Sequence, residues 1–206
     1  MKVLMINGSP HERGTTYIAL SEMVGVFEKE GIECEIVNVG GLTVSGCKTC
    51  GACKKLARCA IPDIVNQIAE KFAAADALVV GSPVYYASPN ATLLAVLDRL
   101  FYSTRFDKRM KVGCAVVAAR RGGLTSSFDV INKYFAISGM PIATGQYWNG
   151  LHGGADAEAT RTDLEGLQSM RTLAYNAAFL MKAIALAKEQ LPPPTSEPKV
   201  RTSFIR

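Results

Sequence analysis

The first sixteen residues constrain the fold of this chain more than any other stretch of the sequence. Residues 3–6 form a short apolar run, which is typical of a strand buried on both faces. Gly8 and Pro10 then break regular structure, and Gly14 precedes two threonines that can begin a helix. A strand that leads through such a loop into a helix makes an anion pocket, because the first N–H groups of a helix have no partner within it. Residues 8–16 are therefore either a phosphate-binding loop or an ordinary connection with a capped helix.

Strand and helix patterns alternate along the remaining chain. Strands are expected at 33–39, 77–80, 112–118 and 141–147, and helices at 15–31, 64–75, 90–101 and 124–138. A long helical stretch, either continuous or broken, is expected at 157–187. This alternation predicts an α/β protein, a three-layer sandwich in which helices cover both faces of a parallel sheet. We expect one domain over residues 1–190, with a Gly- and Cys-rich insertion at 40–61 and a Pro-rich C-terminal tail at 191–206.

The composition is that of a globular domain and argues against several functions. Of the 206 residues, 49% are hydrophobic and 20% are charged, a balance that allows one sizeable core. The net charge of +5 is spread over small separate groups rather than gathered in a stripe, so no nucleic-acid partner is expected. No apolar run approaches the roughly 18 residues of a membrane helix. No signal peptide precedes Asn7, so the expected location is the cytoplasm, with no membrane partner.

Three loops of unusual composition leave the same edge of the expected sheet. They follow the first, third and fourth strands, at residues 8–16, 82–89 and 118–123. Ligands of open α/β sheets bind outside the carboxyl ends of the strands, so these loops should face one ligand. The second loop offers Tyr85 and Tyr86, whose rings can flank a flat ring system, and the third offers two glycines and two arginines. A planar ligand that carries a phosphate, such as flavin mononucleotide (FMN), suits all three loops.

The motifs in these loops resemble those of the NADPH-dependent FMN reductase family, a flavodoxin-like group of NAD(P)H oxidoreductases. The resemblance rests on Gly8-Ser9-Pro10, Gly14-Thr15-Thr16, Gly81-Ser82-Pro83-Val84-Tyr85 and Leu97-Asp98-Arg99. It implies a flavodoxin-like, five-stranded parallel sheet in the order 2-1-3-4-5, with FMN at the carboxyl edge, and a homodimer or homotetramer. Neither G-x-x-x-x-G-K-[ST] nor G-x-G-x-x-G occurs, which argues against a P-loop hydrolase and a dinucleotide Rossmann site.

The resemblance also implies, position by position, which residues bind FMN. Those expected to hold the phosphate are Ser9, His11, Gly14, Thr15 and Thr16. Those expected to line the isoalloxazine ring are Pro83, Val84, Tyr85 and Tyr86, with Ala119, Arg120 and Gly122 on the other side. Family members more often carry Arg in place of His11 and Asn in place of Thr15.

The activity that the resemblance implies is that of an FMN-dependent NAD(P)H oxidoreductase with ping-pong exchange. Hydride passes from the co-substrate NAD(P)H to FMN, and the electrons then pass to a quinone, a nitro or azo compound, or free flavin. Because the flavin carries the chemistry, no catalytic side chain is nominated. Two alternatives stay open. One is an iron–sulfur flavoprotein that passes single electrons between a 4Fe-4S cluster and FMN, and the other is a non-enzymatic, flavodoxin-like electron carrier.

Four of the six cysteines form a compact run at Cys47, Cys50, Cys53 and Cys59. Zinc sites usually separate two C-x-x-C pairs by a dozen or more residues, whereas the spacing C-x2-C-x2-C-x5-C suits a four-iron cluster with each thiolate on a different iron. The run also resembles that of the iron–sulfur flavoproteins, a branch of the same family, in which it binds a 4Fe-4S cluster. The alternative is a relict motif, kept as a folded loop or as redox-sensitive thiols.

Two further segments carry apolar side chains without an obvious place in the core. Tyr147 and Trp148 lie at the end of the expected last strand, where they either roof the flavin or nicotinamide or plug a packed loop or an interface. The tail holds Val200, Phe204 and Ile205, which either pack on the chain's own surface, pack on a second subunit, or are disordered.

Overall fold

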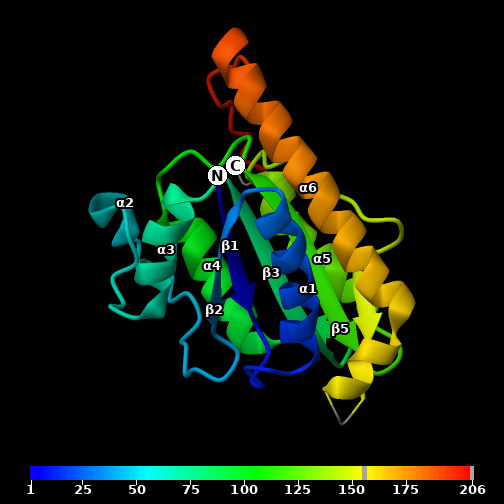
Figure 1. Cartoon of the computed structure of the whole chain (residues 1–206). Helices are drawn as coiled ribbons and strands as arrows, with labels where there is room; N and C mark the ends of the chain where they lie inside the picture. The colour runs from blue at the N-terminus through cyan, green and yellow to red at the C-terminus, as the bar shows by residue number, and fades with distance from the viewer. Residues whose placement is uncertain (155–156, 205–206) are drawn as a thin grey trace.

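The computed structural model describes residues 1–154 and 157–204 and shows a three-layer α/β architecture (Figure 1). The strands are β1 (Lys2–Asn7), β2 (Glu33–Asn38), β3 (Ala77–Tyr85), β4 (Ser88–Pro89), β5 (Val112–Ala119) and β6 (Gly150–His152). Five of them form a parallel path in the order β2-β1-β3-β5-β6, which corresponds to the expected order 2-1-3-4-5. The fold is therefore the flavodoxin-like α/β class that the sequence indicated.

Helices cover both faces of this sheet. One face carries α1 (Thr15–Lys29) and α6 (Leu164–Gln190). The other face carries α3 (Ile64–Ala74), α4 (Ala91–Ser103) and α5 (Leu124–Ile137). Two short helices complete the chain, α2 (Cys53–Leu56) and the 3-10 helix η1 (Glu158–Thr162).

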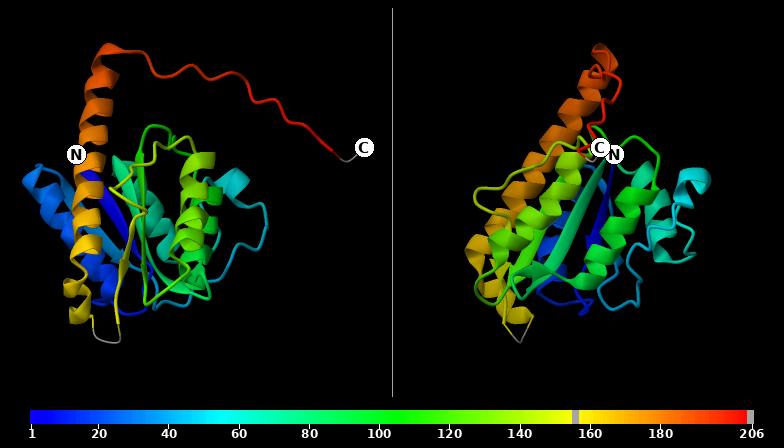
Figure 2. Two further views of the ribbon diagram at one scale, coloured as in Figure 1. Left: turned by 90° about the vertical axis from the view of Figure 1, so that its right-hand side faces the viewer. Right: turned by 180° about the vertical axis from the view of Figure 1, so that it is seen from behind.

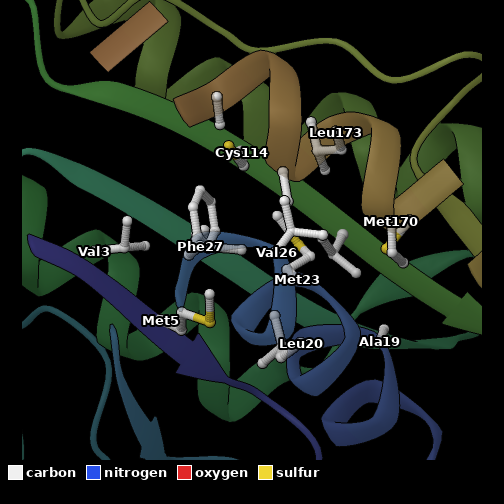
Figure 3. Packing of buried hydrophobic residues seen from close by; sticks show 14 of the residues in the cluster. Val3, Met5, Ala19, Leu20, Met23, Val26, Phe27, Cys114, Met170 and Leu173 are labelled. Atoms are coloured by element: carbon white, nitrogen blue, oxygen red, sulfur yellow. The ribbon is translucent and has the colours of Figure 1, made fainter. Parts of the chain in front are cut away.

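Strand β1 shows why the first apolar run has no polar face. Val3 and Met5 pack on the side of α1 and α6, where Figure 3 shows them among the side chains of those helices. Leu4 and Ile6 point the other way, into the cluster on the side of α3, α4 and α5. All four side chains are fully buried, and each contributes about 1.5–3 kcal/mol of hydrophobic stabilisation. The strand therefore belongs at the centre of the sheet.

The expected last strand at 141–147 is wrong, because that segment makes only one bridge to the sheet. Gly113 donates its N–H to the carbonyl of Pro141 and accepts from the N–H of Ala143, which pairs Gly113 with Ile142 alone. The chain then leaves the sheet in a loop that Asn149 closes. The Oδ1 atom of Asn149 accepts the N–H of Gly145 at 3.1 Å. The strand that completes the sheet is β6, three residues long and paired with the carboxyl end of β5.

Strand β4 corrects the expectation of a sheet with five strands, all of them parallel. It is a two-residue antiparallel strand that folds back on the end of β3, with Val84 opposite Pro89 and Tyr85 opposite Ser88. The turn between them holds Tyr86 and Ala87, both with positive φ, as a type I′ hairpin turn requires. Because this turn follows the carboxyl end of β3, it shapes the edge of the sheet where ligands bind.

The helical stretch expected at 157–187 is broken into two helices, because Asp163 follows η1 and caps α6. The Asp163 carboxylate accepts the N–H of Gly166 at 2.9 Å. Helix α6 extends beyond the sheet, and Figure 2 shows residues 191–204 leaving its end as an extended segment. Val200 and Phe204 are both 94% exposed, so neither packs on the described part of this chain. Ile205 lies outside the described residues.

A search of the described residues for membrane-spanning segments found no helix with the necessary length and apolarity.

Gly113 gives a test of the packing between β5 and α5. A Cβ atom at this position would lie 2.5 Å from the ring of the buried Phe135, so Gly113→Ala should destabilise the protein by about 1–3 kcal/mol. Gly25 is the control, since a Cβ atom there would meet nothing within 4 Å and Ala favours the helix interior by about 0.5–1 kcal/mol. Urea unfolding measures both variants, and equal stabilities would contradict this packing.

Candidate functional site

Three loops that the sequence singled out meet at the carboxyl edge of the sheet, around a cavity of about 660 Å³. The first follows β1, the other two begin in the last residues of β3 and β5, and a fourth segment after β6 joins them. In Figure 1 these loops lie at the lower edge of the sheet. The lining residues are Ser9, His11, Glu12, Arg13, Gly14, Thr15, Thr16, Pro83, Val84, Tyr85, Ala118, Ala119, Arg120, Gly153, Gly154 and Ala157.

Most of the residues expected to bind FMN line this cavity. The two that do not are Tyr86 and Gly122. Tyr86 occupies the hairpin turn between β3 and β4 and is fully exposed to solvent. Gly122 lies on the exposed loop after β5, with nothing within 4 Å of a Cβ atom built on it. The cavity thus brings together the first loop, the end of β3 and the end of β5.

The first loop is held in place by hydrogen bonds from the side chains of Asn7 and Ser9. The buried Asn7 accepts the N–H of Ser9 at 3.0 Å and donates to the carbonyl of Glu12 at 3.3 Å. It also donates to Asn38 Oδ1 on β2, at 2.9 Å. Ser9 Oγ in turn accepts the N–H of His11 at 3.1 Å. This hydrogen-bonded loop keeps its shape before any ligand arrives.

The start of α1 is open to an anion. The residue before the helix is Gly14, which has no side chain to cap the first N–H groups, and the first turn contains no acidic residue. Unpaired N–H groups and the helix dipole both favour negative charge at such a position. Arg13 and Arg120 add two guanidinium groups to the lining of the cavity. The geometry is therefore that of an anion-binding site.

Gly40, just after β2, lies so close to the first loop that no other residue fits. A Cβ atom on Gly40 would lie 2.2 Å from the carbonyl oxygen of Gly8. The same carbonyl accepts a hydrogen bond from Asn90 Nδ2, at 2.7 Å. This contact was not predicted from the sequence, because its only signal is a pair of glycines directly after a strand.

The segment after β6 supplies lining residues that sequence reasoning also missed. Gly153 and Gly154 line the cavity, and a Cβ atom on Gly153 would lie 2.2 Å from Thr15 Oγ1. They were missed because the last strand was placed too early in the chain. Tyr147 and Trp148 precede β6 and make an edge-to-face contact with their ring centroids 4.6 Å apart, but they do not line this cavity.

A second, smaller cavity lies at the cysteine-rich segment, which Figure 1 shows beside α3, away from the sheet. Its volume is about 80 Å³, and all four cysteines of the compact run line it. Helix α4 supplies the facing wall. The lining residues are Cys47, Lys48, Thr49, Cys50, Gly51, Cys53, Cys59, Ala60, Ile61, Arg99, Tyr102 and Ser103. The structure thus gathers the predicted metal ligands around one space.

The other two cysteines are unsuited to bind metal. Cys114 lies within β5 and is fully buried, which raises the pKa of its thiol to about 12. Burial, with help from the nearby carboxylates of Glu28 and Glu33, raises the pKa of the Cys34 thiol to about 11. Both thiols therefore stay protonated at neutral pH, as expected for structural cysteines.

Arg99 joins α4 to the cysteine segment. Its side chain is 1% exposed, and its Nε and Nη2 donate to Cys59 Sγ at 3.3 and 3.2 Å. Its Nη1 and Nη2 donate to the Asp63 carboxylate at 2.6 and 2.9 Å. Partial burial opposes ionisation of Asp63, but hydrogen bonds from Arg99 and from the N–H of Val65 outweigh it and lower the pKa of Asp63. The positive charge of the guanidinium is thus balanced by the Asp63 carboxylate, and the group points at the sulfur atom of Cys59.

Ser103 is an orphaned polar group at the same cavity. Its hydroxyl is buried and has no hydrogen-bond partner. A buried hydroxyl without a partner costs about 1–3 kcal/mol, and an acceptor bound in this cavity would remove that cost. Within residues 1–154 and 157–204, no three His, Cys, Asp or Glu side chains are arranged to hold a single metal ion.

The comparisons with known proteins identify the family. Residues 1–154 match the family model described as NADPH-dependent FMN reductase, and the chain belongs to this family of flavin oxidoreductases. An iron–sulfur flavoprotein of Methanocaldococcus jannaschii is 33% identical over 192 residues, covering 89% of this chain and 99% of that protein. An iron–sulfur flavoprotein of Methanosarcina thermophila is 31% identical over 188 residues, covering 89% of this chain and 97% of that protein.

A comparison of structures supports the fold. A flavodoxin from the domain Archaea superimposes with a TM-score of 0.60 at 14% identity, covering 88% of this chain and 99% of that one. At this identity the likeness concerns the fold alone.

Asp63→Asn tests the ion pair that fixes the cysteine segment. The variant leaves Arg99 buried without its carboxylate, and we expect a loss of about 3 kcal/mol, the low end for a buried pair because Asp63 is 26% exposed. The pKa of Asp63 is lowered in the folded state, so its stabilisation is complete above the ordinary value of 3.8 and is lost as the pH falls through the lowered value.

Urea unfolding between pH 7 and pH 3 measures the difference in the free energy of unfolding between wild type and Asp63→Asn. The exposed Asp129 on α5 provides the control, because Asp129→Asn should change stability by less than about 0.5 kcal/mol. A gap between wild type and Asp63→Asn that stays constant down to pH 3 would contradict the assignment.

Proposed function

We propose that this chain is an FMN-dependent oxidoreductase whose cysteine-rich segment holds a 4Fe-4S cluster that exchanges single electrons with the flavin. The observation that carries this proposal is the cavity that all four cysteines of the compact run line together. The two archaeal relatives, each similar along most of its length, are named iron–sulfur flavoproteins. Of the functions that the sequence left open, this one uses both cavities.

FMN suits the larger cavity at both of its ends. The uncapped start of α1 suits the phosphate, and Arg13 and Arg120 favour its negative charge. The opposite wall is formed by Pro83, Val84 and Tyr85, which suit a planar ring. The volume of about 660 Å³ falls within the range of small-molecule sites, about 300–1,000 Å³.

A 4Fe-4S cluster suits the smaller cavity by the chemistry of its lining. Cysteine thiolates are the ligands that iron–sulfur clusters take, and each binds a different iron. Ligands of a cluster therefore stand farther apart than ligands of one ion. Arg99 and Ser103 add hydrogen-bond donors, one already directed at Cys59 and one without a partner.

The chain's own part in the reaction is to bind, orient and shield. When bound, the flavin supplies one- and two-electron chemistry, and the cluster supplies single electrons. The loop that Asn7 and Ser9 shape fixes the phosphate end of the flavin site. Arg99 and the buried Cys53 keep solvent from the inner side of the cysteine cavity.

NAD(P)H is a second candidate source of electrons for the same flavin. The family description favours it, and so does the wall of the larger cavity at Tyr85, which is 45% exposed and is followed by the fully exposed Tyr86 in the hairpin turn. A nicotinamide could stack beside these rings and then leave, so that a quinone, a nitro or azo compound, or free flavin takes its place. This route needs no acid or base from the chain.

FMN binding gives the first test. Added FMN should lose fluorescence on binding, and the melting temperature of the protein should rise. Gly40→Ala should weaken binding at least about tenfold, because its Cβ atom would lie 2.2 Å from the carbonyl of Gly8 and displace the phosphate loop. Gly41→Ala is the control, since a Cβ atom on Gly41 would lie no closer than 3.6 Å to another atom, the carbonyl oxygen of Pro10. Wild-type protein that neither quenches FMN nor gains stability would refute the flavin site.

Cysteine variants give the second test. After anaerobic purification, Cys50→Ser should lose most of the bound iron and sulfide, because one iron then lacks its thiolate. Cys34→Ser should keep both, because Cys34 lies on β2, outside the cysteine cavity. Iron and acid-labile sulfide analysis measures the difference. Equal iron in the two variants would contradict the assignment of ligands.

A further inference from the structure

One face of α4 presents two buried polar side chains to the cysteine cavity. Arg99 and Ser103 are four residues apart, so they lie on the same face of the helix, and both line the cavity. Their exposed fractions are 1% and 3%. Buried polar groups are costly unless they are paired, yet the Ser103 hydroxyl has no partner. This polar wall stands out in a helix that otherwise packs leucines and a valine into the core.

The Arg99 guanidinium is arranged to act on one sulfur in particular. Two of its nitrogen atoms donate to Cys59 Sγ, at 3.3 and 3.2 Å. Nη1 also donates to the Asp63 carboxylate and the carbonyl of Ser45, and Nη2 also donates to the Asp63 carboxylate and the carbonyl of Ile61, at 2.6–3.3 Å. These contacts leave the guanidinium little freedom to rotate. Cys59 is held as well, since Asn66 accepts its N–H and donates to its carbonyl, each at 3.1 Å.

We propose that Arg99 is a positioning residue that orients Cys59 and, together with Ser103, raises the reduction potential of the cluster. The carboxylate of Asp63, which is paired with Arg99, limits this rise. This inference rests on the proposed function, because it assumes that the cysteine cavity holds the cluster.

The physical reason lies in the charge that the cluster gains. Reduction adds one electron to an already negative group, and hydrogen bonds to the sulfurs stabilise the added charge. Donation from Arg99 and Ser103 therefore raises the reduction potential. The negative charge of Asp63, held against Arg99, lowers it. Loss of a donor and loss of the carboxylate should thus shift the potential in opposite directions.

The experiment is an anaerobic redox titration of full-length holoprotein, with the reduced cluster followed by electron paramagnetic resonance. In Arg99→Lys, which keeps the charge but loses the planar two-donor contact, the ratio of reduced to oxidised cluster at a fixed potential should fall about tenfold. That fall corresponds to a shift of about 59 mV for a one-electron couple. Ser103→Ala should shift the potential the same way by less, and Asp63→Asn should shift it upward.

Asp98→Asn is the matched control. Asp98 precedes Arg99 on α4, but it is exposed, accepts a hydrogen bond from Tyr134 and does not line the cavity. Its loss should leave the potential unchanged, because solvent screens exposed charge. A purely structural role for Arg99 and Asp63 predicts less cluster or lower stability in both variants, without opposite shifts.

The outcomes separate this inference from the proposed function. Wild-type protein without iron and sulfide would refute the proposed function itself. Wild type and variants with full cluster content but equal potentials would overturn only the role of Arg99 and Ser103. If Arg99→Lys assembles no cluster, Ser103→Ala and Asp63→Asn decide the matter, and shifts of the same sign, or none, would overturn the inference.

Discussion

Burial of both faces of the parallel sheet is the constraint on which the rest of this structure depends. Successive residues of β1 enter two separate cores, so helices must cover both sides, and the connections can leave only at the ends of the strands. A ligand then has access only at the edge where the loops meet. The larger cavity lies there, with the uncapped start of α1 at one end and the β3–β4 hairpin beside it.

The cysteine-rich segment lies outside this layered packing and is held by a different force. Between β2 and α3 it contains only the four-residue helix α2, and of its cysteines only Cys53 is buried. In place of a broad apolar contact, Arg99 of α4 binds Cys59, Asp63 and two backbone carbonyls. Such a buried ion pair adds little net stability, but it fixes one arrangement of groups. One guanidinium thus connects the rigid fold to the cysteine-rich segment.

The sequence was informative where structure is decided locally, and misleading where it depends on distant pairing. The run at 3–6 and the glycines after it predicted β1, its loop and α1, because burial on two faces and an uncapped helix start leave local patterns. The three-residue β6 has no pattern of its own and exists only by pairing with β5. The contacts of Gly40 and Arg99 were likewise hidden, although Arg99 belongs to one of the motifs that carried the family resemblance. Their partners, Gly8 and Asp63, are more than thirty positions away in the sequence.

The number of electrons that one chain accepts tests most directly whether the chain holds both FMN and a 4Fe-4S cluster. Anaerobically purified protein is titrated with dithionite, while the flavin is followed by visible absorbance and the cluster by electron paramagnetic resonance. A chain that holds both groups accepts about three electrons, two on FMN and one on the cluster. Uptake of about two electrons, all of them on the flavin, would contradict the account, because the cysteine cavity would then hold no redox centre.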